Sequence, residues 1–69
     1  MIRKGTKVSW QWGQGTATGK VLATYSESIS KTFQGTEVTR HGEPGNKALL
    51  IEQDDGNQVL KLENEVKRQ

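Results

Sequence analysis

Eight glycines divide this chain into short segments, and that division limits its possible folds more than any other feature. Between the glycines, apolar and polar residues alternate with the period of two that is typical of half-buried strands. The 3.6-residue period of an amphipathic helix is absent until the last few positions. The pattern therefore predicts a small all-β domain of the barrel or sandwich class.

The first third of the chain predicts two strands, at about residues 6–12 and 16–25. Gly13-Gln14-Gly15 lies between them and is expected to form the turn. The second strand is unusually long. Gly19 in its middle marks a place where the strand can bend or where another backbone can approach closely. A long bent strand allows a small sheet to close on itself.

The middle of the chain predicts a polar hairpin. Residues 28–33 and 36–40 are expected to pair about a turn at Gln34-Gly35, and the segment contains few large apolar side chains. The glycines and the proline of residues 40–47 then predict a loop. We therefore expect this hairpin to be an excursion from the main domain.

The last hairpin, ALLIEQDDGNQVLKL, contains Asp55-Gly56, the dipeptide favoured in type I′ turns. If these two residues form the loop, Leu49 lies opposite Leu62 and Ile51 lies opposite Leu60. A four-residue loop leaves that register unchanged, whereas a three-residue loop slips it by one. The sequence therefore predicts the register in which Leu49 lies opposite Leu62 and Ile51 lies opposite Leu60. The following ENEVK is expected to form one short helical turn, with Val66 plugging an open barrel end.

Length and composition predict a single domain over residues 1–69, with a core at about 4–66. The chain has no cysteine and one histidine, so neither a disulfide framework nor an ordinary zinc site is expected. The longest apolar run, ALLI, is too short for a membrane span, and no signal peptide is visible. Together these features predict a cytoplasmic monomer without a metal or cofactor.

Charge is distributed unevenly along the chain, whose formal net charge is +2. Residues 1–40 contain six Lys/Arg and two Glu, whereas residues 41–69 contain four Lys/Arg and six Asp/Glu. Such an asymmetry can attract anions to one side of a small domain. The alternative is an ordinary solvated surface of mixed charge.

Gly19-Lys20 superficially suggests a nucleotide-binding loop. A P-loop needs a glycine five residues before its Gly-Lys pair and Ser or Thr after it, where this chain has Gln14 and Val21. A strand follows instead of a helix, so no helix N-terminus is there to bind phosphate. His41 has no triad-like neighbours, and the acidic residues near the last turn have a structural reason to be there. We therefore expect no enzymatic activity.

Several motifs together resemble one protein family. KGTKVSWQWGQGTATGKV, EVTR, ALLIEQDDGNQVLKL and ENEV are similar to the Tudor domain of hypervirulence-associated proteins, over about residues 4–66. The resemblance implies a small five-stranded SH3-like barrel of Tudor type. With the features above, the expected fold is this barrel with a polar hairpin excursion and a short C-terminal helical turn.

Tudor domains that read methylated lysine or arginine use a cage of aromatic side chains. By motif, Trp12 stands where the first cage aromatic is found. The second position falls in Thr16-Ala17-Thr18, and the remaining two fall on Glu52 and Asp55. Only one of the four positions is aromatic. The resemblance therefore does not predict a reader of methylated side chains.

The aromatic residues also suggest where a ligand binds. Trp10 and Trp12 share one face of the first strand, and two indoles exceed what a barrel this small encloses. We expect Trp10 in the core and Trp12 exposed at the barrel mouth. Tyr25 and Phe33 are expected to pack on the barrel, with exposed stacking as the alternative for Phe33.

The basic residues near these rings are Lys7, Lys20, Lys31, Arg40 and Lys47. Spread singly, they are ordinary solvated charges. If they share one face with Trp12 and Phe33, they form a cationic strip suited to a single-stranded nucleic acid or to an acidic protein tail. The candidate ligand-binding residues are Trp12, Tyr25, Phe33, Lys31 and Arg40. The first hypothesis is thus a non-catalytic module that binds a nucleic-acid or protein segment at the barrel mouth. A second is a structural or regulatory protein that docks on a partner by the hairpin edge. A third is capture of a phosphate-bearing nucleotide cofactor by the basic strip.

Overall fold

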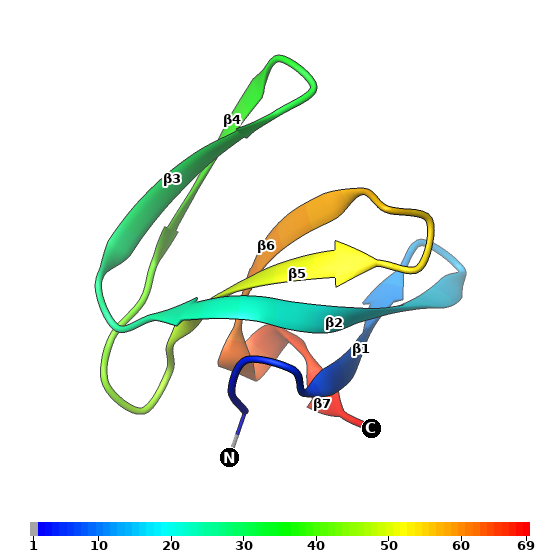
Figure 1. Ribbon diagram of the computed structural model, residues 1–69, viewed down its shortest axis with the longest axis horizontal. Coiled ribbons are helices and arrows are strands. Elements are labelled where there is room, and N and C mark those ends of the chain that lie inside the picture. The colour runs from blue at the N-terminus through cyan, green and yellow to red at the C-terminus, as the bar shows by residue number, and fades with distance from the viewer. Residues whose placement is uncertain (1) are drawn as a thin grey trace.

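The strands of the domain form two sheets, which Figure 1 shows as a curved main sheet and a separate two-stranded hairpin. The computed structural model describes residues 2–69. Its elements are β1 (Lys7–Trp12), β2 (Gly15–Tyr25), β3 (Ser28–Phe33), β4 (Thr36–His41), β5 (Ala48–Gln53), β6 (Gln58–Leu62), the 3-10 turn η1 (Glu63–Glu65) and β7 (Lys67–Arg68). The all-β prediction is confirmed. No helix in residues 2–69 is long and apolar enough to cross a membrane.

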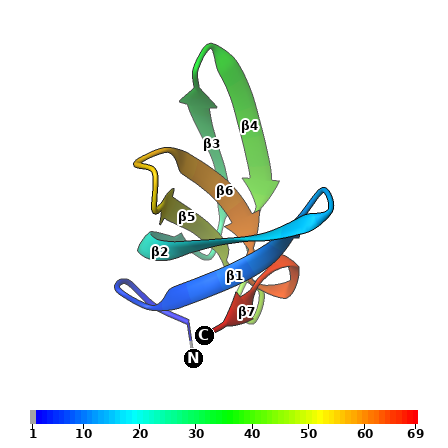
Figure 2. The same ribbon diagram turned by 90° about the vertical axis from the view of Figure 1, so that its right-hand side faces the viewer.

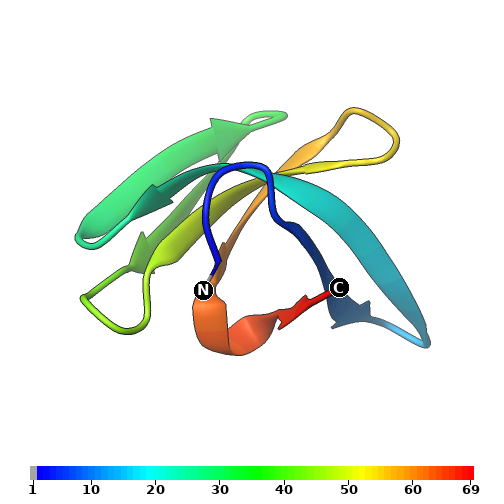
Figure 3. The same ribbon diagram turned by 60° about the horizontal axis from the view of Figure 1, so that its bottom comes forward.

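The main sheet has the order β6-β5-β2-β1-β7, with every neighbouring pair antiparallel. It curls so strongly that η1 and β7 come round beneath β1 (Figure 3). The end strands β6 and β7 are not paired with each other, so the sheet is open and the predicted closed barrel is not confirmed. Strand β7, which the sequence did not predict, pairs with the start of β1.

The long strand β2 bends at Leu22, where its register with β5 shifts between Val21 and Ala23. The sequence placed the bend at Gly19, three residues too early. Gly19 instead allows a close approach of β5. A Cβ atom there would lie 2.6 Å from the carbonyl oxygen of Glu52 and 2.6 Å from Cγ2 of Ile51. The absence of a side chain at Gly19 thus lets the neighbouring strand β5 lie close to β2.

The main core lies on the concave side of the sheet. Its buried members are Val8, Trp10, Val21, Leu49 and Ile51. Trp10 is 4% exposed, as predicted from its mid-strand position. Partly buried side chains pack around this cluster; they are Ile2, Ala17, Val59 and Val66. The short helical turn expected over ENEVK is η1, but it ends at Glu65, and Lys67 belongs to β7. Val66 packs against the core.

The register predicted for β5 and β6 is wrong by one residue. Leu50 lies opposite Leu60 and Ile51 lies opposite Val59. The loop has three residues, because the amide of Gly56 donates to the carbonyl of Gln53 at 2.9 Å and Gly56 then takes a φ of 91°. This is a β-turn followed by a left-handed residue, the usual form of three-residue hairpin loops. Gly56 thus ends the turn instead of occupying its centre.

This register gives β5 and β6 two apolar faces. Leu49, Ile51 and Val59 face the main core, whereas Leu50 and Leu60 lie on the opposite face. Leu60 is nevertheless only 2% exposed. The β3–β4 hairpin, residues 28–41 and called the arm below, contacts β6 and rises beside it (Figure 2). The arm therefore covers the second face of the β5–β6 hairpin. The turn predicted at Gln34-Gly35 is confirmed, with a positive φ at both residues.

Candidate functional site

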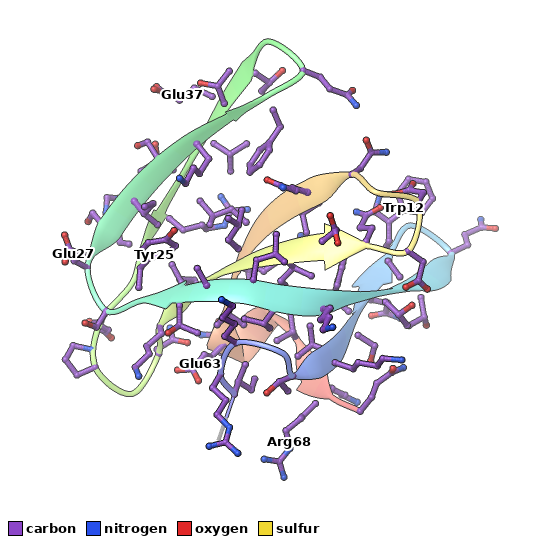
Figure 4. All side chains as sticks on the ribbon, in the orientation of Figure 1. Trp12, Tyr25, Glu27, Glu37, Glu63 and Arg68 are labelled. Atoms are coloured by element: carbon purple, nitrogen blue, oxygen red, sulfur yellow. The ribbon has the colours of Figure 1, made fainter. Side chains whose placement is uncertain are left out.

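Trp12 is the one large apolar side chain that is exposed among residues 2–69, at 71%. It lies at the end of β1, opposite Gly15, which offers no side chain to cover it. Strand β7 pairs only with Val8 and Ser9, so the outer edge of β1 near Trp12 has no strand beside it. The prediction that Trp12 would be the exposed indole is confirmed. Figure 4 shows its ring at the rim of the molecule.

A groove of about 470 Å³ follows this free edge of β1. We call it the edge groove; its lining residues are Ser9, Trp10, Gln11, Thr16, Asn64, Glu65, Val66 and Lys67. Gln11 and Thr16 form the cross-strand pair next to Trp12, so the groove ends close to the exposed indole. Its lining includes the hydroxyl groups of Ser9 and Thr16 and the amide groups of Gln11 and Asn64, and Lys67 adds a positive charge.

The carboxylate of Glu65 also lines the edge groove but has partners of its own. Its Oε1 accepts the Leu62 amide at 2.8 Å and the Arg40 guanidinium at 3.3 Å. That second contact is an ion pair, the only one among residues 2–69. Arg40 therefore neutralises the one negative charge in the groove.

Tyr25 lies far from Trp12. Trp12 pairs with the first residue of β2, whereas Tyr25 is the last residue of that 11-residue strand. The two rings therefore lie at opposite ends of β2, about 30 Å apart along an extended chain, and Figure 4 shows them on opposite sides of the molecule. The sequence placed them at one mouth.

Lys31, Phe33 and Arg40 lie together on one face of the arm. They alternate with exposed serine and threonine residues and are half-buried, so they face the body of the domain. Phe33 lines a second groove of about 460 Å³ between the arm tip and the β5–β6 turn. Across this tip groove, the amide of Gln34 donates to Oδ1 of Asn57 at 3.3 Å. The five predicted site residues thus fall into three separate places.

The comparison with known families gives one match. The model of the hypervirulence associated proteins Tudor domain matches residues 5–66. The chain belongs to this family. No curated protein and no solved structure matches it. Tudor domains are generally small, non-catalytic binding modules.

The structure of this Tudor domain gives no aromatic cage around Trp12. Among residues 2–69, Trp10 is buried, Tyr25 lies at the far end of β2, and Phe33 is on the arm. Trp12 therefore has no second exposed ring beside it to form a wall. A methyl-ammonium group needs such walls for cation–π attraction, so the geometry offers a single stacking platform instead.

One feature of the Tudor domain resembles part of a hydrolytic site. Oγ of Ser28 and Nδ1 of His41 share a hydrogen bond of 2.8 Å across the arm. Both residues are exposed, and they form one rung of a polar cross-strand ladder with the next rung at Ser30 and Thr39. Neither the edge groove nor the tip groove includes these two residues. The pair thus has a structural reason, as a side-chain contact between two strands.

The fold brings two members of the predicted cationic strip, Lys7 and Lys20, together with a basic residue from the end of the chain that the sequence analysis did not include. Lys7 and Lys20 lie opposite each other in β1 and β2, and Lys67 of β7 lies opposite Ser9 on the same face of the sheet, whereas Arg68 lies opposite Val8 on the other face. The backbone of Arg3 closes a turn onto Thr6 just before β1. Charge counting along the chain missed this group, because its members come from both ends of the sequence.

Proposed function

We propose that this Tudor domain is a non-catalytic binding module that engages an extended nucleic-acid or protein segment at Trp12 and the edge groove. The observation that carries the proposal is the exposure of Trp12. An indole that is 71% exposed gains no folding energy from most of its surface. Burial against a ligand would recover that energy, which is why exposed aromatic residues mark binding surfaces.

The edge groove supports an extended ligand rather than a compact one. It runs beside an unpaired strand edge and is lined with hydroxyl and amide groups that donate and accept hydrogen bonds. Such a surface suits a polymer that presents polar groups at regular intervals. The half-buried Lys31, Phe33 and Tyr25 lie elsewhere, so the proposed site keeps Trp12 from the sequence prediction and adds Gln11, Thr16 and Asn64.

An NMR titration of the ¹⁵N-labelled domain tests this proposal. The two indole N–H signals report separately on Trp10 and Trp12, so each ligand is read at the buried and the exposed ring at once. We would titrate single-stranded DNA, duplex DNA, RNA, NADPH and a trimethyl-lysine peptide. The proposal expects shifts at Trp12 and Gln11 with a polymer and none at Trp10. If the indole N–H signal of Trp12 does not shift with any of these ligands, the proposed site is wrong.

A second candidate function is docking on a partner through an edge of the arm. Strands β3 and β4 pair only with each other, so each has an unpaired outer edge. Such edges can accept an added strand from a partner. Proline at exposed Thr39 in β4 would block this pairing. If the Thr39→Pro variant loses a partner that the wild-type domain captures, while Trp12→Ala still captures it, the docking site is the arm and not Trp12.

A further inference from the structure

The tip groove differs in chemical composition from the rest of the surface. Its lining combines the hydroxyl group of Thr32, the phenyl ring of Phe33 and the carboxamides of Gln34, Gln53, Asn57 and Gln58. In a chain of which 26% of the residues are charged, no Lys, Arg, Asp or Glu among residues 2–69 lines it. It does contain four of the nine Asn and Gln residues of the chain. The groove is thus neutral and rich in groups that both donate and accept hydrogen bonds.

An aromatic ring and a carboxamide lie on the two sides of this groove. Phe33 is half-buried, alternates with the exposed Thr32 and faces the body of the domain. Gln58 lies two residues before Leu60, so its side chain is on the face of β6 that the arm contacts. The groove between them has a volume of about 460 Å³. That volume is in the range of small-molecule sites, about 300–1,000 Å³.

Hydrogen bonds fix one wall of the tip groove before any ligand binds. The backbone amide of Asn57 donates to Oδ1 of Asp55 at 2.9 Å, and Nδ2 of Asn57 donates to Oδ2 of Asp55 at 3.2 Å. Oδ1 of Asn57 in turn accepts Nε2 of Gln34 at 3.3 Å. Asn57 is therefore held at both ends of its carboxamide. Oε1 of Gln34 and the carboxamide of Gln58 take no part in these bonds and are available to a ligand.

Gln34 is also distinguished by its backbone. Its φ is 51°, and it is the one non-glycine residue with a positive φ in the part of the chain that the structure describes. The two-residue turns that need a positive φ at both centres favour Asn at the first of them, not Gln. The longer Gln side chain is the one that reaches Asn57 across the groove. Residues in such sparsely populated conformations cluster at ligand sites, so the arm turn is a second observation that points to this groove.

Acidic residues border the tip groove and decide the charge of its ligand. Glu37 lies opposite Thr32 in the arm, and Figure 4 shows it near the arm tip. Asp54 and Asp55 belong to the turn between β5 and β6. Lys31, on the side of the arm that faces the body, is half-buried and does not line the groove. Phosphate groups would be repelled by this border, whereas an uncharged ligand would not.

We propose that the tip groove binds a neutral carbohydrate of one or two sugar units. A pyranose ring presents C–H groups on its faces and hydroxyl groups around its rim. The C–H groups pack on the phenyl ring of Phe33, and the hydroxyl groups pair with carboxamides such as those of Gln34 and Gln58, which donate and accept at once. This site is separate from Trp12 and the edge groove, so the inference does not rest on the proposed function.

An NMR titration of the ¹⁵N-labelled domain with maltose, cellobiose and N,N′-diacetylchitobiose tests the inference. The side-chain amide signals of Gln34 and Gln58 and the backbone amide of Phe33 report on the groove. At least one disaccharide is expected to give saturable shifts at these signals and none at the indole of Trp12. Adenosine and AMP are titrated in parallel. Saturable shifts in the groove with a nucleoside or nucleotide alone, or with none of the five compounds, would overturn the carbohydrate assignment.

Two variants locate the sugar within the domain. Gln34→Asn keeps a carboxamide and suits the turn, but its side chain is one methylene shorter. It should weaken sugar binding about 3- to 10-fold, the contribution of one hydrogen bond, without lowering the melting temperature. Gln14→Asn makes the same change in the exposed β1–β2 turn and is the matched control, with unchanged affinity expected. Phe33→Leu keeps apolar packing but removes the aromatic face, and it should weaken binding by a similar factor.

The outcomes for these variants are decisive and independent of the proposed function. If Gln34→Asn and Phe33→Leu bind the disaccharide as tightly as the wild type, the sugar does not occupy the tip groove and the inference is wrong. Trp12→Ala should bind the disaccharide normally, so failure at one site leaves the other intact. Thermal melting identifies a variant that is unfolded, and the second variant then carries the test.

Discussion

Gly42 is the position at which the structure predicts the largest effect of adding one methyl group. It lies where the chain leaves the arm and returns to the body of the domain (Figure 1). A Cβ atom there would meet the carbonyl oxygen of Tyr25, the amide nitrogen of Ala48 at 2.8 Å and the carbonyl oxygen of Glu27 at 2.9 Å. All three are backbone atoms, so no side chain can rotate away to make room.

The expected cost of Gly42→Ala follows from this geometry. Overpacking by small groups costs about 1–3 kcal/mol, and three rigid backbone contacts place Gly42 in the upper half of that range. The whole domain is expected to be stable by only about 3–10 kcal/mol at its size. Because about 1 kcal/mol shifts the melting temperature of such a domain by about 4–8 °C, the variant should melt at a clearly lower temperature.

Gly15→Ala is the matched control. The nearest atom to a Cβ at Gly15 is the carbonyl oxygen of Trp12 at 3.9 Å, an ordinary contact. Both substitutions reduce the entropy of the unfolded chain equally, which alone stabilises by about 0.4–1 kcal/mol. Their difference in unfolding free energy, measured by urea denaturation, therefore isolates the clash at about 2–3 kcal/mol. Two variants within 0.5 kcal/mol of each other would refute the reasoning.

Three further predictions concern the two tryptophans, the packing of the arm on β6, and the ion pair. Trp10→Ala should cost about 3–5 kcal/mol and Trp12→Ala less than about 0.5 kcal/mol in urea denaturation, because only the first ring is buried. Leu60→Ala should lower the free energy of unfolding by about 2–4 kcal/mol, since Leu60 is buried on the face of β6 that the arm contacts. The same variant should speed amide hydrogen exchange in the arm, and arm amides as protected as in the wild type would contradict this. A double-mutant cycle on Arg40 and Glu65 should give a coupling below about 1 kcal/mol, because both side chains are about one-third exposed, 32% and 35%.

Local pattern was sufficient to predict most of the strands. The ends of β3 were predicted to the residue, and β1 and β2 each differ by one residue at their start. Burial of Trp10 and exposure of Trp12 were also predicted, because both follow from strand periodicity and from the limited volume of a small core. These properties depend on neighbouring residues in the chain.

The β5–β6 register shows where local pattern fails. Asp55-Gly56 is compatible with a two-residue turn and with a three-residue turn in which Gly56 takes the left-handed position. The structure adopts the second, and Leu60 is still buried because the arm contacts β6 on the face that carries Leu50 and Leu60. The choice between the two registers therefore depended on packing by a distant hairpin.

The candidate site divides in the same way. The sequence by itself determined that the domain is all-β, that glycines form its turns, and that one indole exceeds what the core holds. Only the tertiary structure decided what surrounds that indole. Strand β7 pairs with the start of β1 and leaves the edge of β1 near Trp12 free, while the register shift at Leu22 and the length of β2 place Tyr25 far away. The physical reason is that strand periodicity is local, whereas charge clustering and strand neighbours depend on which distant backbones pair.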